Sequence, residues 1–511
     1  MTHVRPRHTA TPRRRRPSTS LGLSTDGRGP GGGPCRDLPG AHDRRPRFMV
    51  AVVVVVVVEW GSDPATREES VVAVLTAEQF QDVEGTEDWR VLAQGASAWF
   101  AASSHGAGAA LVRRVVQDCS AVGHVPDLDL RATGVHVRTL STDAGLTGID
   151  VEVARVVSAA ARELGLEADP STVRTLNLTI DAMDTDAVMP FWQATLGYER
   201  FEDDLLDPRR RHPGIWFQQM DEPRPLRNRI HLDVGWPHEI ARDRVASAIA
   251  AGGQVVRDSG GWHNTVADAE GNEADLFPLS GSDPFTAAPG LEDWRAMLDA
   301  GVHYPAEVER GTALVEEVAR LADDAGVGLL INLRPDGVAI WSGKDCWGRP
   351  GYEDLARQVQ RAAREAGLVA DLRQVRDLQI AIDARDVAGV RSFWEAALGY
   401  RRLTDVVPDG SPTDLFDPYW INPPLLFQRI DPALDPDHAA RAAQRGRIHV
   451  DLFVPDDQAE ARVAAAVAAG GRVVYEAEAP DWGTVADPEG NELDIAVSVG
   501  RQERWLAAHG G

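Results

Sequence analysis

Histidines in and beside predicted strands are the side chains of this sequence best suited to chemistry. His124 stands in Gly123-His-Val-Pro-Asp127, directly before an alternating run, and His231 stands in Arg229-Ile-His-Leu-Asp-Val234. In the second segment, strand alternation puts Arg229, His231 and Asp233 on one face and the apolar residues on the other. Imidazole titrates near neutral pH, so it can exchange protons or bind ligands. No Ser-His-Asp order, phosphate loop or dinucleotide fingerprint accompanies these residues.

The elements that must position these histidines occur twice. Residues 173–198 and 375–400 are two copies offset by 202 positions (375 − 173), and residues 265–275 and 484–494 are two more, offset by 219 (484 − 265). Each of the first pair begins as a strand and continues as a helix, which Gly197 or Gly399 ends. The unequal offsets place insertions in loops, where extra length costs little.

The stretch from Val71 to Leu166 predicts a small α+β layer, with helices around two alternating strands. Thr147 caps its last helix, whose buried stripe should include Ile149 and Leu164. Alternation places His136 at a solvent-facing strand position.

The segments GHVPDLDL, VHVRTLSTD and LTGIDVEVAR of this stretch resemble the pterin-4a-carbinolamine (4a-hydroxytetrahydrobiopterin) dehydratase family. Members use three histidines to handle protons during loss of water. The resemblance implies that His124 and Asp127 are the catalytic residues here. Val125 and Thr142 stand where the family has its other two histidines, so this set is incomplete.

The segments FWQATLGY, RIHLDV and ADAEGNEADLF resemble a glyoxalase-like domain of the vicinal oxygen chelate (VOC) superfamily. Members fold two βαβββ modules into a cupped sheet that often holds a divalent metal. The resemblance implies four ligand-binding positions in each cup, which are Asn177, Gln218, His231 and Asp275 in the first and Gln379, Gln428, His449 and Asp494 in the second. Because neutral amides are weak metal ligands, we expect polar pockets without a metal cofactor. If an ion binds, His231, Asp275, His449 and Asp494 would hold it.

The whole chain therefore predicts an α+β protein in which dehydratase-like layers alternate with VOC domains of paired βαβββ modules, as an A-B-A′-B′ duplication. A disordered basic leader should cover residues 1–70, because it is rich in Arg, Pro and Gly. The units that follow are dehydratase-like (71–168), glyoxalase-like (173–280), degenerate dehydratase-like (285–370) and glyoxalase-like (373–499). The third unit has Val327 where the first has His124.

Charge and composition limit the partners of the chain. Its formal net charge is −25, although residues 1–47 carry eleven Arg and three Asp. Such an acidic body repels nucleic acid and anionic membranes, so we expect neither as a partner. Three scattered cysteines favour a reducing cytoplasm over an oxidising compartment. The duplicated halves should pair within the chain, and a homo-oligomer is left open.

Three functions fit these patterns. The first is a carbinolamine dehydratase, a lyase acting through His124, with reduced activity. The second is a binding protein whose cups hold a small pterin-like or polar aromatic ligand without turning it over. The third is a metal-dependent VOC lyase or dioxygenase. The dehydratase is the interpretation that the resemblance favours by name.

Overall fold

The computed structural model describes residues 55–57, 70–93, 95–281, 284–430, 437–441 and 443–509. Most of the predicted leader lies outside these residues. Within this leader, strand β1 (Val55–Val57) pairs with β2 (Ser70–Val72), so the expectation of disorder is wrong for Val55–Val57 and Ser70.

The fold class is confirmed, because the chain forms α+β layers that contain three eight-stranded sheets. Among the described helices, none combines the length and the apolar character needed to cross a bilayer.

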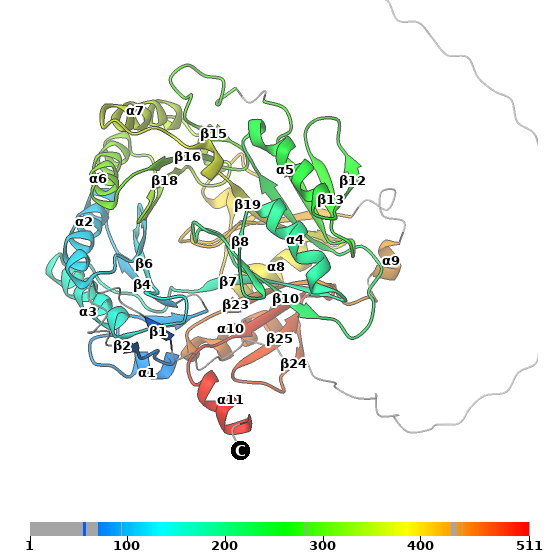
Figure 1. Ribbon diagram of the computed structural model, residues 1–511. Coiled ribbons are helices and arrows are strands. Elements are labelled where there is room, and N and C mark those ends of the chain that lie inside the picture. The colour runs from blue at the N-terminus through cyan, green and yellow to red at the C-terminus, as the bar shows by residue number, and fades with distance from the viewer. Residues whose placement is uncertain are drawn as a thin grey trace, which may run out of the picture. The chain divides into compact units, whose positions relative to one another are not determined.

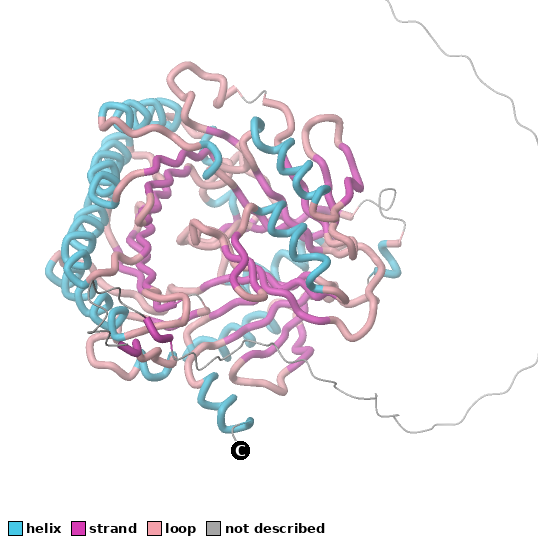
Figure 2. The backbone as a smooth tube through the Cα atoms, in the orientation of Figure 1, coloured by secondary structure: helices cyan, strands magenta, loops and turns pink. Residues whose placement is uncertain are grey.

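Sheet 3 joins the two dehydratase-like units through a single pair of strands. Its strand order is β15 (Arg295–Ala296), β16 (Ala300–Pro305), β18 (Gly337–Trp341), β17 (Leu330–Arg334), β5 (Asp127–Arg131), β6 (Gly134–Thr139), β4 (Gly95–Ala101) and β3 (Arg90–Leu92). The junction is the antiparallel pair β17 and β5. Helices α2 (His105–Val122), α3 (Gly148–Glu163), α6 (Val308–Ala325) and α7 (Tyr352–Glu365) line one side of this sheet, and α1 (Ala77–Gln81) precedes β3 (Figures 1 and 2). One hydrophobic core runs through both units.

The modules of the glyoxalase-like units pair across the two halves of the chain. Sheet 1 has the order β24 (Arg472–Tyr475), β25 (Trp482–Ala486), β26 (Glu492–Ala496), β23 (Ile448–Phe453), β7 (Thr175–Ala182), β10 (Ile215–Gln219), β9 (Asp204–Leu206) and β8 (Glu199–Phe201). Sheet 2 has the order β12 (Gln254–Asp258), β13 (Asn264–Ala267), β14 (Glu273–Phe277), β11 (Ile230–Gly235), β19 (Asp377–Ala384), β22 (Leu425–Arg429), β21 (Leu415–Phe416) and β20 (Arg401–Arg402). The junctions are β23 with β7 and β11 with β19, both antiparallel. Each sheet therefore takes one module from each half.

This pairing corrects the predicted grouping of the cup residues. Sheet 1 combines Asn177 and Gln218 with His449 and Asp494, and sheet 2 combines Gln379 and Gln428 with His231 and Asp275. The expectation that each glyoxalase-like unit closes its own cup is wrong. The residue set of each cup keeps the same chemical types, because the exchanged modules are copies of one another.

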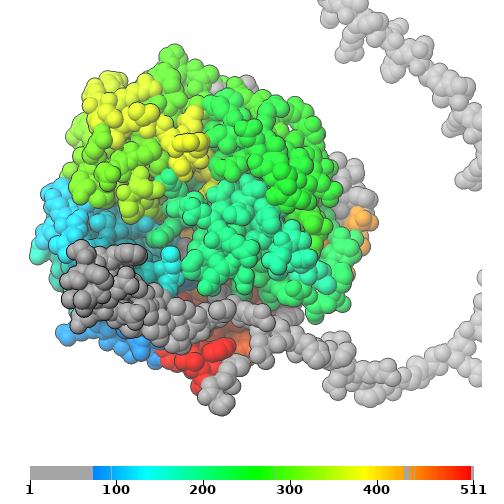
Figure 3. All heavy atoms as spheres, viewed as in Figure 1, coloured from blue at the N-terminus to red at the C-terminus, as the bar shows by residue number. Residues whose placement is uncertain are grey.

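The glyoxalase-like part of the fold also contains helices α4 (Thr185–Leu196), α5 (His238–Ala250), α8 (Val387–Leu398), α9 (His438–Arg441), α10 (Ala459–Ala468) and α11 (Arg501–His509). The two repeated motifs meet at α4 and α8. Trp192 of α4 donates a hydrogen bond to Asp268 at 3.0 Å, and Trp394 of α8 donates one to Asp487 at 3.1 Å. These bonds join the modules of one unit even though the modules belong to different sheets. The surface in Figure 3 accordingly combines segments from the whole described chain.

Candidate functional site

Two clusters of one histidine and two aspartates lie on equivalent strands of sheets 1 and 2. Cluster 1 consists of His449, Asp451 and Asp494, and cluster 2 consists of His231, Asp233 and Asp275. In each, one imidazole nitrogen and two carboxylate oxygens lie within 4.8 Å of one another. The histidine and first aspartate alternate along β23 or β11, and the second aspartate stands beside them on the parallel neighbour, β26 or β14.

In cluster 1, two residues from the first half of the chain donate hydrogen bonds to one carboxylate oxygen of Asp451. Oδ2 of Asp451 accepts hydrogen bonds from the Thr179 hydroxyl at 2.7 Å and the Trp216 indole at 2.8 Å. Its Oδ1 lies 3.5 Å from Nε2 of His449, which lies 3.7 Å from Oδ2 of Asp494. Among the described residues, Oδ1 of Asp451 is buried and has no hydrogen-bond partner. The free oxygen therefore faces the imidazole.

Cluster 2 repeats this arrangement with amide donors. Gln379 donates a hydrogen bond to Oδ2 of Asp233 at 2.8 Å, and Oδ1 of Asp233 lies 3.7 Å from Nε2 of His231. Gln428 donates to Asp383 at 2.9 Å and lies 3.4 Å from the same imidazole nitrogen. The amides thus orient the cluster from the opposite half of the chain.

The electrostatics of both clusters favour retained protons or a bound cation. Burial raises the pKa of Asp451 to about 7, while His449 opposes the rise and Asp494 adds to it. Burial also raises the pKa of Asp494, and it raises the pKa of Asp233 to about 6. Burial disfavours charged His449, yet Asp494 and Asp451 raise its pKa overall. Each cluster therefore disfavours two ionised carboxylates unless a cation is bound.

The clusters differ at their rims. In sheet 2, Nε2 of His263 lies 3.6 Å from Oδ2 of Asp275, and its pKa is lowered, mainly by burial. Trp482 occupies the same place in sheet 1, at the offset of 219 positions (482 − 263). In sheet 1, the carboxylates of Asp451 and Asp494 instead interact electrostatically with Arg501 of α11. Cluster 2 thus has a neutral imidazole where cluster 1 has an indole, and each cluster has a guanidinium nearby, because Nη2 of Arg257 lies 3.6 Å from Oδ2 of Asp275.

The predicted dehydratase residues lie apart from these clusters, in the first unit. His124 is half-buried, and its Nε2 is buried without a hydrogen-bond partner among the described residues. Burial lowers its pKa, against the influence of Asp150 and Asp127. Arg138 donates to Asp127 at 2.7 Å. Although burial works the other way, Arg334, Arg138 and Arg210 hold the pKa of Asp127 below its ordinary value. Asp127 is therefore a fixed carboxylate, which is a poor proton donor.

Sequence reasoning located His231, Asp275, His449 and Asp494 but left Asp233 and Asp451 out of the site. The available signal was the i, i+2 spacing after each histidine, which puts both residues on one face of a strand. Asn177 stands opposite Asp451 in the strand register, as Gln379 stands opposite Asp233. Gln218 occupies the place in β10 that Gln428 has in β22.

Strand pairing and the duplicated clusters define a class of protein, an α+β fusion of a layered domain with paired βαβββ modules. Residues 177–277 and 379–496 match the family model described as glyoxalase-like domain, and residues 73–160 match the model for pterin 4 alpha carbinolamine dehydratase. The chain is therefore similar to pterin-4a-carbinolamine dehydratases in one region and to glyoxalase-like domains in two others.

Several solved structures resemble the chain at low similarity. Glyoxalase I from Zea mays is 10% identical and aligns over 66% of this chain and 98% of its own, with a TM-score of 0.35. A glyoxalase-related enzyme from Fulvimarina pelagi is 21% identical, over 23% of this chain and 85% of its own, with a TM-score of 0.18. The cppA protein from Streptococcus pneumoniae TIGR4 is 9% identical, over 63% and 97%, with a TM-score of 0.28. Likeness at this level carries no argument about function. Among curated proteins, none matches the sequence.

The clusters fit a divalent cation better than the sequence suggested. Each offers an imidazole and two carboxylates, where the predicted sets offered one of each beside two amides. Two ligand atoms of one cation with bonds of about 2.1 Å lie about 3 to 4.2 Å apart. The imidazole nitrogen of His449 lies 3.5 Å and 3.7 Å from oxygens of Asp451 and Asp494, and that of His231 lies 3.7 Å from Asp233, which is within this range. Oδ1 of Asp451 belongs to cluster 1 already, and Oε1 of Gln379, which has no hydrogen-bond partner among the described residues, is a further acceptor beside cluster 2.

Proposed function

We propose that each cluster binds one divalent cation and that cluster 2 is the active centre of a metal-dependent enzyme acting on small polar organic substrates. The observation that carries this proposal is the duplicated set of one imidazole and two carboxyl groups within 4.8 Å, in which burial disfavours charged carboxylates without a cation. One imidazole with carboxylates suits Mn²⁺, Fe²⁺ or Zn²⁺.

In cluster 2, His231, Asp233 and Asp275 would hold the cation, and Gln379 fixes the orientation of Asp233. A bound cation supplies a Lewis acid that polarises a substrate oxygen. His263 is the candidate general base, because its lowered pKa keeps the imidazole neutral at pH 7 and its Nε2 faces Asp275. Its Nε2 also contacts the Ser259 hydroxyl at 2.9 Å, which steadies the ring.

Titration of the metal-free full chain with Mn²⁺, followed by electron paramagnetic resonance, tests this function. We expect one bound ion per cluster, with one lost in His231→Ala and the other in His449→Ala. His238→Ala serves as the control, because its imidazole pairs with Glu239 on α5, outside both clusters. Binding at less than one ion per chain, or binding that both cluster variants retain, would refute the proposal.

Dehydration of the pterin carbinolamine is a second candidate function. It is favoured by one observation, the buried and unpartnered Nε2 of His124, whose lowered pKa leaves it available as a base. Val125, which packs against the core, and Thr142, whose hydroxyl donates to the Gly145 carbonyl at 3.0 Å, cannot share this role. The activity should therefore be weak. Loss of carbinolamine absorbance at the uncatalysed rate with the wild-type chain would exclude it.

A further inference from the structure

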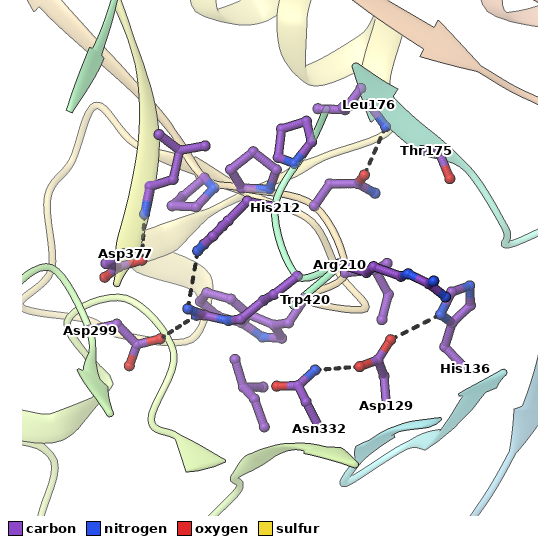
Figure 4. A pocket seen from close by; sticks show the side chains of 18 of the residues that line it. Asp129, His136, Thr175, Leu176, Arg210, His212, Asp299, Asn332, Asp377 and Trp420 are labelled. Atoms are coloured by element: carbon purple, nitrogen blue, oxygen red, sulfur yellow. Dashed lines mark hydrogen bonds and ion pairs between the residues drawn. The ribbon is translucent and has the colours of Figure 1, made fainter. Parts of the chain in front are cut away.

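A pocket lies between sheet 3 and the two loops that join β9 to β10 and β21 to β22 (Figure 4). Its floor comes from β5, β6 and β17, and the starts of β7 and β19 close it from the other side. About 60 Å³ is open to the centre of a water molecule, enough for about four waters or one small ring. The pocket is separate from clusters 1 and 2, none of whose residues line it.

The two loops have the same construction. Asp207 accepts hydrogen bonds from the backbone N–H groups of residues 209, 211 and 212, and it pairs with the buried Arg376. Asp417 accepts from the N–H groups of residues 419, 421 and 422, and it pairs with Arg174 at 2.7 Å. Each carboxylate is buried, so buried hydrogen bonds tie both loops to the fold.

The same position of each loop has a left-handed backbone conformation. Arg210 has φ 49° and Trp420 has φ 54°, a conformation that is strained for a residue other than glycine. Glycine would remove that strain, yet these copies carry an arginine and a tryptophan. Both side chains line the pocket, and Trp420 lies between Asp299 and His136 (Figure 4).

Arg210 is the least engaged cation of the pocket. Arg131 and Arg334 donate to several backbone carbonyls, and Lys344 pairs with Asp414 at 2.9 Å. Arg210, by contrast, lies 3.7 Å from Asp127, too far for a hydrogen bond, and its side chain is 46% exposed. Arg138 donates a hydrogen bond to the backbone carbonyl of Arg210 at 2.8 Å, which fixes the backbone position from which the Arg210 side chain extends.

The lining carries a surplus of positive charge in a chain whose net charge is −25. Five arginines and one lysine face three aspartates, which are Asp129, Asp299 and Asp377. Asp127 and Asp414 stand behind the lining and neutralise two more charges. One cation therefore remains unbalanced, at the end where Arg210 lies beside His136 (Figure 4).

We infer that this pocket binds a planar aromatic carboxylate, with the carboxylate on Arg210 and the ring beside Trp420. A guanidinium pairs well with a carboxylate, and an indole prefers a flat ring as its neighbour. Phe416 stacks on Trp420 with ring centroids 4.7 Å apart, which holds the indole in place. The strained loop positions keep both side chains in the pocket before a ligand arrives.

Calorimetric titration of the full chain with benzoate tests the inference, with cyclohexanecarboxylate and benzamide as probes of ring planarity and of charge. We expect one benzoate per chain and binding at least tenfold weaker for either analogue. Arg210→Gly should weaken benzoate binding at least tenfold while thermal stability is kept or raised, because glycine tolerates the left-handed conformation. Arg113→Ala, at an exposed ion pair with Glu316, is the control.

Three results with the organic probes would overturn the inference. They are the absence of benzoate binding to the wild-type chain, equal binding of benzamide or cyclohexanecarboxylate, and full binding in a folded Arg210→Gly variant. Inorganic phosphate that binds as well as benzoate would also contradict it, because the ring would then contribute nothing. The outcome is independent of the proposed metal centres, since His231→Ala should leave benzoate binding unchanged.

Discussion

Replacing Asp451 with asparagine should stabilise the metal-free protein, and the gain should grow with pH. Burial raises the pKa of this carboxyl group from 3.8 to about 7. The folded state therefore keeps a proton that the unfolded chain releases near pH 4, and stability is lost as pH rises from about 4 to 7. Asparagine has nearly the same shape, and its amide oxygen can still accept from Thr179 and Trp216.

The magnitude follows from the pKa. Between pH 5 and pH 8 the wild-type carboxyl loses the proton that burial favours, which costs about 3 kcal/mol over the two pH units up to its pKa. The advantage of Asp451→Asn over wild type should therefore be about 3 kcal/mol larger at pH 8 than at pH 5. For a chain of this size, that difference corresponds to about 3 °C in Tm.

Thermal unfolding of the metal-free chain at both pH values measures this effect. Asp233→Asn should show about half the pH dependence, because burial raises the pKa of Asp233 only to about 6. Asp417→Asn is the control of opposite sign. Its carboxylate pairs with Arg174, which opposes burial and keeps its pKa low, so the variant should lose stability at both pH values. A loss of Tm in Asp451→Asn that is equal at pH 5 and pH 8 would refute the reasoning.

Three further outcomes follow from the described contacts. Arg501→Ala should tighten Mn²⁺ binding at cluster 1 about tenfold, because a competing cation is removed, and binding at cluster 2 should stay the same in the same titration. Arg229→Ala should destabilise the chain by about 3 kcal/mol or more in thermal unfolding, since its guanidinium bonds Asn491 and two carbonyls of the other half, and Arg447→Ala should match it. His124→Ala should abolish any carbinolamine dehydration without lowering Tm; a rate equal to wild type would exclude this histidine.

The sequence was sufficient to predict the elements that local patterns determine. Gly197 and Gly399 end their helices in the left-handed conformation, with φ values of 64° and 66°. The strand around His231 puts its polar face where alternation predicts it. These features depend on residues close in the sequence, so one copy is enough to recognise them.

The burial of several side chains could not be predicted, because it depends on contacts with segments that are distant in the sequence. Ile149 and Leu164, predicted in a buried stripe, are 39% and 40% exposed, because the helix turns a neighbouring face to the core. His136, predicted to face solvent, is buried at 3.2 Å from Asp129, because the loops of sheets 1 and 2 cover that side of sheet 3. Amphipathic periodicity gives a pattern of faces, but the partner of each face lies far along the chain.

Pairing across the halves could not be predicted for a further reason, which also bears on function. Copies β7 and β19 present nearly the same pattern to β11, so local preference does not choose between them. The choice matters chemically, because every metal-binding side chain of a cluster lies in one half and its orienting donors, Gln379 for cluster 2 and Thr179 for cluster 1, lie in the other. An isolated glyoxalase-like unit would therefore contain one cluster and one set of donors, but it could not bring them together unless it dimerised. The duplication within one chain thus builds the sites.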